Sequence, residues 1–217
     1  MSNQARPDSS RRRITKVLAA LCAIGVLAVA AAALSVLLSP DAPPSVSSAE
    51  GVPASVEPAQ AAGPGELRVI VSKSKRQLVV FRGDTQIRSF RVVLGSEPEG
   101  DKQRQGDGRT PVGTFYVCEK NAKSRFYLFI GVSYPNEEDA ARGLKDGLIT
   151  RDQHDAIVQA IAERRTPPWY TRLGGEMGIH GGGTAWDWTR GCVALDNGDM
   201  RDLYTLIREG TTVIIEP

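Results

Sequence analysis

One apolar segment without any charge, residues 17–38, constrains the fold of this chain more than any other feature of its sequence. As a helix its 22 residues would be about 33 Å long, enough to cross the hydrocarbon core of a bilayer. A cleaved signal peptide has a shorter apolar region of about 7–15 residues, so the sequence favours an uncleaved transmembrane anchor. Cleavage stays open as the alternative, because small residues surround Ala30.

The charges around this segment predict its orientation. Residues 1–16 carry five Lys or Arg and one Asp, a balance of +4, and such basic flanks stay in the cytoplasm. We therefore expect a single-pass protein of the inner (cytoplasmic) membrane, with residues 1–16 as a cytoplasmic tail. Residues 39–65 are rich in Pro, Ser, Ala and Gly without a hydrophobic period, which predicts a flexible linker. The domain after it, residues 66–217, would be extracytoplasmic, in the periplasm.

The charge of this domain excludes one class of partner. It carries 22 basic and 21 acidic residues, and no basic stripe alternates with aromatic residues. A protein that binds nucleic acid concentrates positive charge on one face. We therefore expect no nucleic-acid partner.

Short β-branched segments separated by turn residues dominate the domain. They predict strands over residues 67–71, 77–82, 86–94, 112–118 and 127–134, then a strand into His180 and a last one over 212–215. Residues 136–168 break this rhythm with two helical patterns, the first capped by Asn136 and the second over residues 152–165. A further helix is predicted over 197–208. The class is mainly β with an inserted helical segment, which we expect to wall one side of a cleft.

A lone histidine and a lone cysteine flank a glycine-rich loop in the segment IHGGGTAWDWTRGCVAL, where His180 precedes Cys192 by twelve residues. A disulfide between Cys118 and Cys192 is one interpretation, since exported domains tend to pair their cysteines. Buried inert thiols are another, and a zinc site lacks a third nearby ligand. The last is a nucleophilic pair in which the imidazole takes the thiol proton. Spacing alone leaves catalysis open against disulfide or burial.

The string IHG…TRGCVAL resembles the signature of the L,D-transpeptidase (YkuD) family, in which His-Gly precedes a Ser/Thr-x-Gly-Cys motif. The strings RTPVGTF and GTTVIIEP also match the family pattern in order, so the resemblance covers residues 67–216. It implies an L,D-transpeptidase-like β-sandwich as the fold of the domain. It also implies no metal and no organic cofactor.

The resemblance implies roles for particular residues. Cys192 would be the nucleophile, His180 the general base, and Gly191 with the Cys192 amide the oxyanion site. A backbone carbonyl or Asp187 would orient His180. The candidates for binding substrate are Thr189, Arg190, Gly181, Trp186 and Tyr134.

Arg190 departs from the family pattern, which has His at this position, and Ala194 departs where Asn is common. In an extended chain, residues two apart share a face, so the Arg190 guanidinium would lie beside the Cys192 sulfur. A cation there would favour the thiolate and capture a substrate carboxylate. The alternative is that Arg190 turns to water or pairs with Asp187.

The resemblance implies peptidoglycan stem peptides as substrate. Cys192 would attack the carbonyl at the L-centre of a diaminopimelate–D-Ala bond and release D-Ala. An amine of a second stem would then accept the acyl group and form a 3→3 cross-link. Attachment of a lipoprotein and hydrolysis by water, which would make an L,D-carboxypeptidase, are alternative outcomes. A peptidoglycan-binding module without catalysis is the alternative from another class.

Overall fold

The computed structural model describes residues 65–217. The predicted cytoplasmic tail, the anchor over residues 17–38 and nearly all of the linker lie outside the described residues. Within residues 65–217, none of the helices combines the length and the apolar character that a membrane crossing requires.

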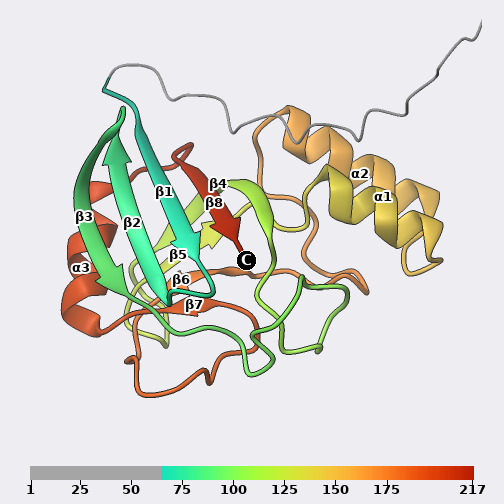
Figure 1. Cartoon of the computed structure of the whole chain (residues 1–217). Coiled ribbons are helices and arrows are strands. Elements are labelled where there is room, and N and C mark those ends of the chain that lie inside the picture. The colour runs from blue at the N-terminus through green and yellow to red at the C-terminus, as the bar shows by residue number, and fades with distance from the viewer. Residues whose placement is uncertain (1–64) are drawn as a thin grey trace, which may run out of the picture. The chain divides into compact units, whose positions relative to one another are not determined.

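Eight strands form a single sheet in the order β3-β2-β1-β8-β4-β5-β6-β7, with three helices outside it (Figure 1). The strands are β1 (Leu67–Ser72), β2 (Gln77–Arg82), β3 (Thr85–Arg91), β4 (Gly113–Asn121), β5 (Phe129–Val132), β6 (Gly178–His180), β7 (Val193–Ala194) and β8 (Thr212–Glu216). The helices are α1 (Glu137–Lys145), α2 (Arg151–Ala162) and α3 (Asn197–Leu206). The mainly β class with a helical insertion is confirmed.

The eight strands form one continuous sheet, whereas the sequence analysis predicted the two separate sheets of a β-sandwich. Strand β4 joins its two halves, because its first residues pair with β8 and its last residues pair with β5. The register shifts between Val117 and Glu119, and such irregularities bend a strand. The sheet therefore curls at β4. Just after β3, Val93 forms an isolated bridge with Ala194 of β7. The chain that follows one edge strand thus pairs with the other edge strand.

The two faces of β5, β6 and β7 have different surroundings, and this difference positions the candidate site. Ile130, Ile179 and Val193 are buried in the main core, which also contains Met200 and Leu203 of α3. Side chains alternate between the two faces of a strand, so the residues next to these three along their strands point to the opposite face. His180 is one of them.

The helical insertion has a hydrophobic cluster of its own. It contains Ala140, Ile149, Ile157 and Leu173, separate from the core of the sheet. Figure 1 shows α1 and α2 side by side at one end of the domain and α3 at the other. The predicted cap is confirmed, since the Asn136 side chain accepts from the Asp139 N–H and the Asp139 carboxylate accepts from the Asn136 N–H.

The second inserted helix ends earlier than its sequence pattern predicts. The helical pattern continues to residue 165, but α2 ends at Ala162. Arg164 has a φ of +52°, a left-handed conformation that stops a right-handed helix.

Candidate active site

His180 is the last residue of β6, and its imidazole is 2% exposed. Its Nδ1 lies 2.6 Å from the carbonyl oxygen of Gly181. Because a carbonyl only accepts hydrogen bonds, Nδ1 carries the proton and Nε2 is left as a proton acceptor. A backbone carbonyl therefore orients the ring, as one of the two sequence alternatives had it. The carbonyl of Gly181 thus holds the imidazole, and the contact of Gly181 with substrate stays a prediction.

Aromatic rings enclose the imidazole of His180. The Phe126 ring stacks on it at 4.6 Å between centroids, and Trp188 meets it edge-on at 5.5 Å. This burial lowers the pKa of His180, and the hydrogen bond to Gly181 offsets only part of the effect. The imidazole is therefore neutral at pH 7 and able to accept a proton.

The strand register brings Cys192 to the same face as His180. In the parallel pair β6–β7, His180 lies opposite Ala194, and Cys192 precedes β7 by one residue. Cys192 is thus beside Gly178, two residues along the strand from His180. With strands about 4.8 Å apart and a rise of about 3.3 Å per residue, the two Cα atoms are about 8 Å apart. The register thus places the two residues predicted to be catalytic on neighbouring segments of the chain, although no hydrogen bond joins their side chains within residues 65–217.

The thiol of Cys192 is half-buried and donates a hydrogen bond to the carbonyl of Glu176, with 3.6 Å between sulfur and oxygen. Desolvation raises the pKa of Cys192 to about 11, and a backbone hydrogen bond from Gly178 and the charge of Lys102 offset only part of this effect. The thiol is partly exposed, but its raised pKa opposes the thiolate that the sequence analysis predicted. The resting group is a neutral thiol near a neutral imidazole.

Arg190 does not create an electropositive setting for this thiol. Its side chain is exposed, and the charged groups that act on the Cys192 sulfur are Lys102 and Glu176. The alternative ion pair with Asp187 is also wrong, because the Asp187 carboxylate binds the Arg76 guanidinium at 2.7 Å. Arg190 is left free to meet a ligand from solvent.

Asp187 holds the glycine-rich loop in place. Its carboxylate binds Arg76 through Nε and Nη2 and also accepts from the Leu94 N–H at 2.8 Å. Burial by itself would raise the pKa of Asp187, but these hydrogen bonds outweigh it and the pKa is lowered. The loop that separates His180 from Cys192 is thereby tied to the β1–β2 turn.

We expect Asp187→Asn to lower the free energy of unfolding by about 1–2 kcal/mol at pH 7, because it removes a charged, partly screened contact. Since the pKa of Asp187 is lower in the folded state, its contribution is present above the unfolded pKa of about 3.9 and is lost as pH falls. Urea unfolding at pH 7 and at about pH 2 measures this. A difference between wild type and variant that is the same at both pH values would contradict it.

The turn before Cys192 uses its own polar groups. The buried Thr189 hydroxyl accepts from the Gly191 N–H at 3.1 Å and donates to the Cys192 carbonyl at 2.6 Å. The Thr189 hydroxyl therefore shapes the turn, and its contact with substrate stays a prediction. The Gly191 N–H is used within the turn, which disfavours the oxyanion role predicted for it. The Cys192 N–H makes no backbone hydrogen bond to any residue in 65–217 and is the free donor at this point.

Gly191 has a structural reason to be glycine. Its φ is +131°, a region that side chains strongly disfavour. A Cβ atom on Gly191 would lie 2.6 Å from the Arg109 carbonyl oxygen. Residues 95–112 therefore pack directly against the backbone of the candidate nucleophile.

Two buried lysines shape this neighbouring segment, and both were missed by the sequence analysis. Lys102, 1% exposed, pairs with Asp107 at 2.7 Å, while Lys73 donates to the carbonyls of Gly100 and Thr110. Burial lowers the pKa of Lys73. The turn residues in GDGRTPVG marked a positioned loop, but a lysine in a polar stretch carries no signal of burial.

Two aromatic residues predicted to bind substrate have opposite environments. Tyr134 is fully buried, and its hydroxyl donates to the Leu173 carbonyl at 3.1 Å. Its predicted place facing the cleft is therefore wrong, because the ring fills space next to the insertion. Trp186 is 69% exposed on the loop that Asp187 anchors, and it is available to a ligand.

The geometry also bears on the disulfide interpretation of the two cysteines. Cys118 and Cys192 are both free, so the predicted alternative of a disulfide is wrong. Burial raises the pKa of Cys118 to about 11, as it does the pKa of Cys192. Among residues 65–217, no three His, Cys, Asp or Glu side chains converge in a way that would hold a metal ion.

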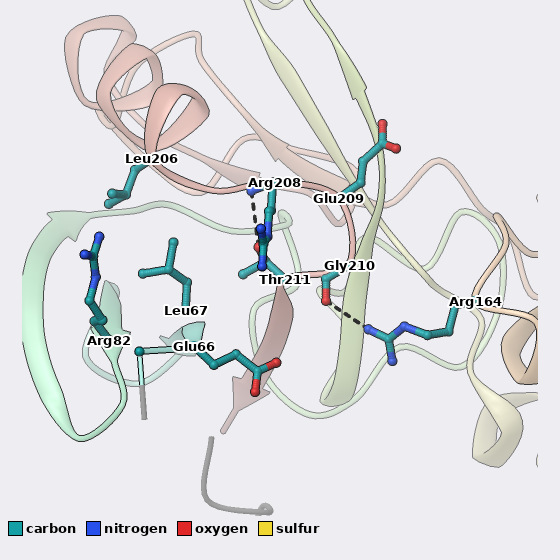
Figure 2. Close-up of a pocket in the computed structure, with 10 residues that line it drawn as sticks. Glu66, Leu67, Arg82, Arg164, Leu206, Arg208, Glu209, Gly210 and Thr211 are labelled. Atoms are coloured by element: carbon teal, nitrogen blue, oxygen red, sulfur yellow. Dashed lines mark hydrogen bonds between the residues drawn. The ribbon is translucent and has the colours of Figure 1, made fainter. Parts of the chain in front are cut away.

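A wide pocket of about 740 Å³ lies elsewhere on the domain (Figure 2). Figure 2 shows Arg82, Arg164, Arg208 and two glutamates around it, where the start of β1 approaches the chain between α3 and β8. Neither His180 nor Cys192 lines this pocket. The paired chemistry of these two residues is the reason for placing the candidate active site at β6 and β7.

Residues 66–215 match the YkuD family, the L,D-transpeptidase catalytic domain. Because the match covers well over half of the chain, the protein belongs to this family. A segment of 58 residues is 40% identical to YafK of Escherichia coli (strain K12), a protein assigned by name to the L,D-transpeptidases. That segment covers 25% of this chain and 23% of YafK.

Solved structures agree on the fold. Pgp2 from Campylobacter jejuni, a helical cell shape determining protein, superposes with a TM-score of 0.50 at 22% identity. The match covers 70% of this chain and 47% of Pgp2. Its K307A mutant gives a TM-score of 0.50 at 23% identity, covering 71% of this chain and 48% of that one. The chain thus spans about half the length of these solved relatives.

Proposed function

We propose that residues 66–217 form a peptidoglycan L,D-transpeptidase that makes 3→3 cross-links between stem peptides. The observation that carries the proposal is the placement of His180 and Cys192 on one face of adjacent parallel strands in a domain of the YkuD family. A module that only binds peptidoglycan would need neither the oriented imidazole nor the thiol.

In the first step, the Cys192 sulfur attacks the carbonyl at the L-centre of diaminopimelate. The Nε2 of His180 takes the thiol proton and passes it to the leaving D-Ala amine, so a C–N bond breaks as the thioester forms. The unused Cys192 N–H donates to the developing oxyanion.

In the second step, the side-chain amine of another stem attacks the thioester and restores the thiol. Exposed Arg190 is suited to bind a carboxylate of a stem peptide, and exposed Trp186 offers an apolar surface on the same loop. Attachment of a lipoprotein uses the same acyl-enzyme with a protein amine. Hydrolysis to a tripeptide would make the protein an L,D-carboxypeptidase.

Incubation of the purified full chain with a stem tetrapeptide alone tests the proposal. We expect release of D-Ala and a cross-linked dimer that has lost one D-Ala, both measured by mass spectrometry. Tripeptide without dimer would favour the carboxypeptidase, and an unchanged tetrapeptide that still binds would favour the binding module.

The proposed location is the inner (cytoplasmic) membrane, with the catalytic domain in the periplasm, because residues 17–38 are apolar and follow a basic tail. We expect the protein in the inner-membrane fraction, with residues 66–217 cut by protease added to spheroplasts. A mature N-terminus at residue 31 or later would instead show that the segment is a cleaved signal.

A further inference from the structure

Glu176 contacts the candidate nucleophile but takes no part in the proposed first step. Its backbone carbonyl accepts from the Cys192 thiol at 3.6 Å. Its φ is +53°, a left-handed conformation that is uncommon for residues other than glycine. Two glycines, Gly174 and Gly175, precede it and would themselves adopt such a turn without strain. The chain therefore keeps a carboxylate where glycine would fit better.

The charge of Glu176 is not compensated by a cation. Its side chain is exposed, and it makes no ion pair with any residue in 65–217. The exposed hydroxyl of Tyr170 lies 3.4 Å from its Oε1. A second carboxylate, Glu119, lies close enough that Glu176 contributes to raising the pKa of Glu119, after burial. The residue whose backbone contacts the Cys192 thiol thus carries an exposed negative charge without an ion-pair partner in residues 65–217.

This charge opposes the first step of the proposed reaction. A carboxylate near the sulfur disfavours the thiolate, and Glu176 acts on Cys192 in this direction. The charge of Glu176 therefore gives no help to the first step, and its effect on the second step is a separate question. The second step brings an amine to the same carbon, and an amine approaches from water as an ammonium ion.

We propose that the Glu176 carboxylate is a specificity-determining group that attracts the ammonium of an amine acceptor to the Cys192 thioester. This inference rests on the proposed transpeptidase function. The acceptor loses one proton to solvent, and its nitrogen attacks the thioester carbonyl. An amide C–N bond forms, the C–S bond breaks, and His180 passes the second amine proton to the sulfur. Water, which is uncharged, gains nothing from Glu176, so the carboxylate favours cross-linking over hydrolysis.

The test uses the full chain as wild type and as Glu176→Gln, with Glu138→Gln on exposed α1 as matched control. The acyl-enzyme formed from tetrapeptide is offered a stem tripeptide with a charged amine or, separately, neutral hydroxylamine. For Glu176→Gln we expect the ratio of aminolysis to hydrolysis to fall about fivefold with the stem amine, the effect of one exposed charge pair in water. With hydroxylamine the ratio stays unchanged. Acyl-enzyme forms as fast as in wild type or faster.

Salt provides an independent readout of the same charge. Raising the ionic strength from about 0.05 M to about 1 M should remove the preference of the wild type and leave Glu176→Gln unchanged. An equal ratio in wild type and Glu176→Gln, or an equal loss with hydroxylamine, would overturn the inference while the transpeptidase function stands. A wild type that forms no acyl-enzyme would overturn that function, and this inference with it.

Discussion

Replacing Cys192 with Ala is expected to abolish D-Ala release, lowering its rate on the order of 10³-fold or more. The reason is that no other group in the site can form the thioester, while the small side chain leaves the strand pairing of β6 and β7 intact. Release of D-Ala is followed by mass spectrometry, and the fold by the thermal unfolding midpoint.

Cys118→Ala is the matched control for this variant. Cys118 is also a free, half-buried thiol, but it lies on β4, where the strand register places no histidine opposite it. We expect it to keep its activity within about twofold of wild type, because its thiol takes no part in the reaction. An inactive, folded Cys118→Ala beside an active Cys192→Ala would reverse the assignment of the nucleophile.

The second large effect is expected from Gly191→Ala. The new Cβ would have to occupy a φ of +131° and lie 2.6 Å from the Arg109 carbonyl oxygen, so the backbone must move. Backbone strain and displacement together predict a loss of about 2–4 kcal/mol in the free energy of unfolding. Activity should fall as well, since Cys192 is the next residue. Urea unfolding and D-Ala release measure the two effects.

Gly198→Ala is expected to change the free energy of unfolding in the opposite direction in the same experiment. Gly198 lies in the first turn of α3, and a Cβ there would meet nothing within 4 Å. Alanine in a helix is favoured over glycine by about 0.5–1 kcal/mol, so this variant should be slightly more stable. A Gly191→Ala protein as stable as Gly198→Ala would show that residues 95–112 do not hold the turn rigidly.

Local patterns in the sequence predict much of this fold. The β-branched runs place β1 and β2 to within one residue, and Asn136 marks the start of α1, because strand alternation and helix capping are decided by near neighbours. The pairing of strands is different. Strand β8, at the end of the chain, lies between β1 and β4 and is parallel to β1. No local pattern specifies a partner that is more than a hundred residues away.

The candidate site divides in the same way. The spacing of His180 and Cys192 pointed to a pair, and the register of β6 and β7 brings it together. The environment of Cys192 was predicted wrongly, since adjacency to Arg190 in sequence says nothing about which side chain packs on the sulfur. The partner of Asp187 is Arg76, 111 residues earlier in the chain, which only the folded chain brings within reach.

The most direct test of the central claim is the intact mass of the full chain after brief exposure to stem tetrapeptide, followed by peptide mapping. We predict an adduct equal to the tetrapeptide minus D-Ala, located on Cys192 and absent from Cys192→Ala. The thioester should disappear when an amine acceptor is added. An adduct on Cys118, or D-Ala release without any covalent intermediate on Cys192, would contradict the account.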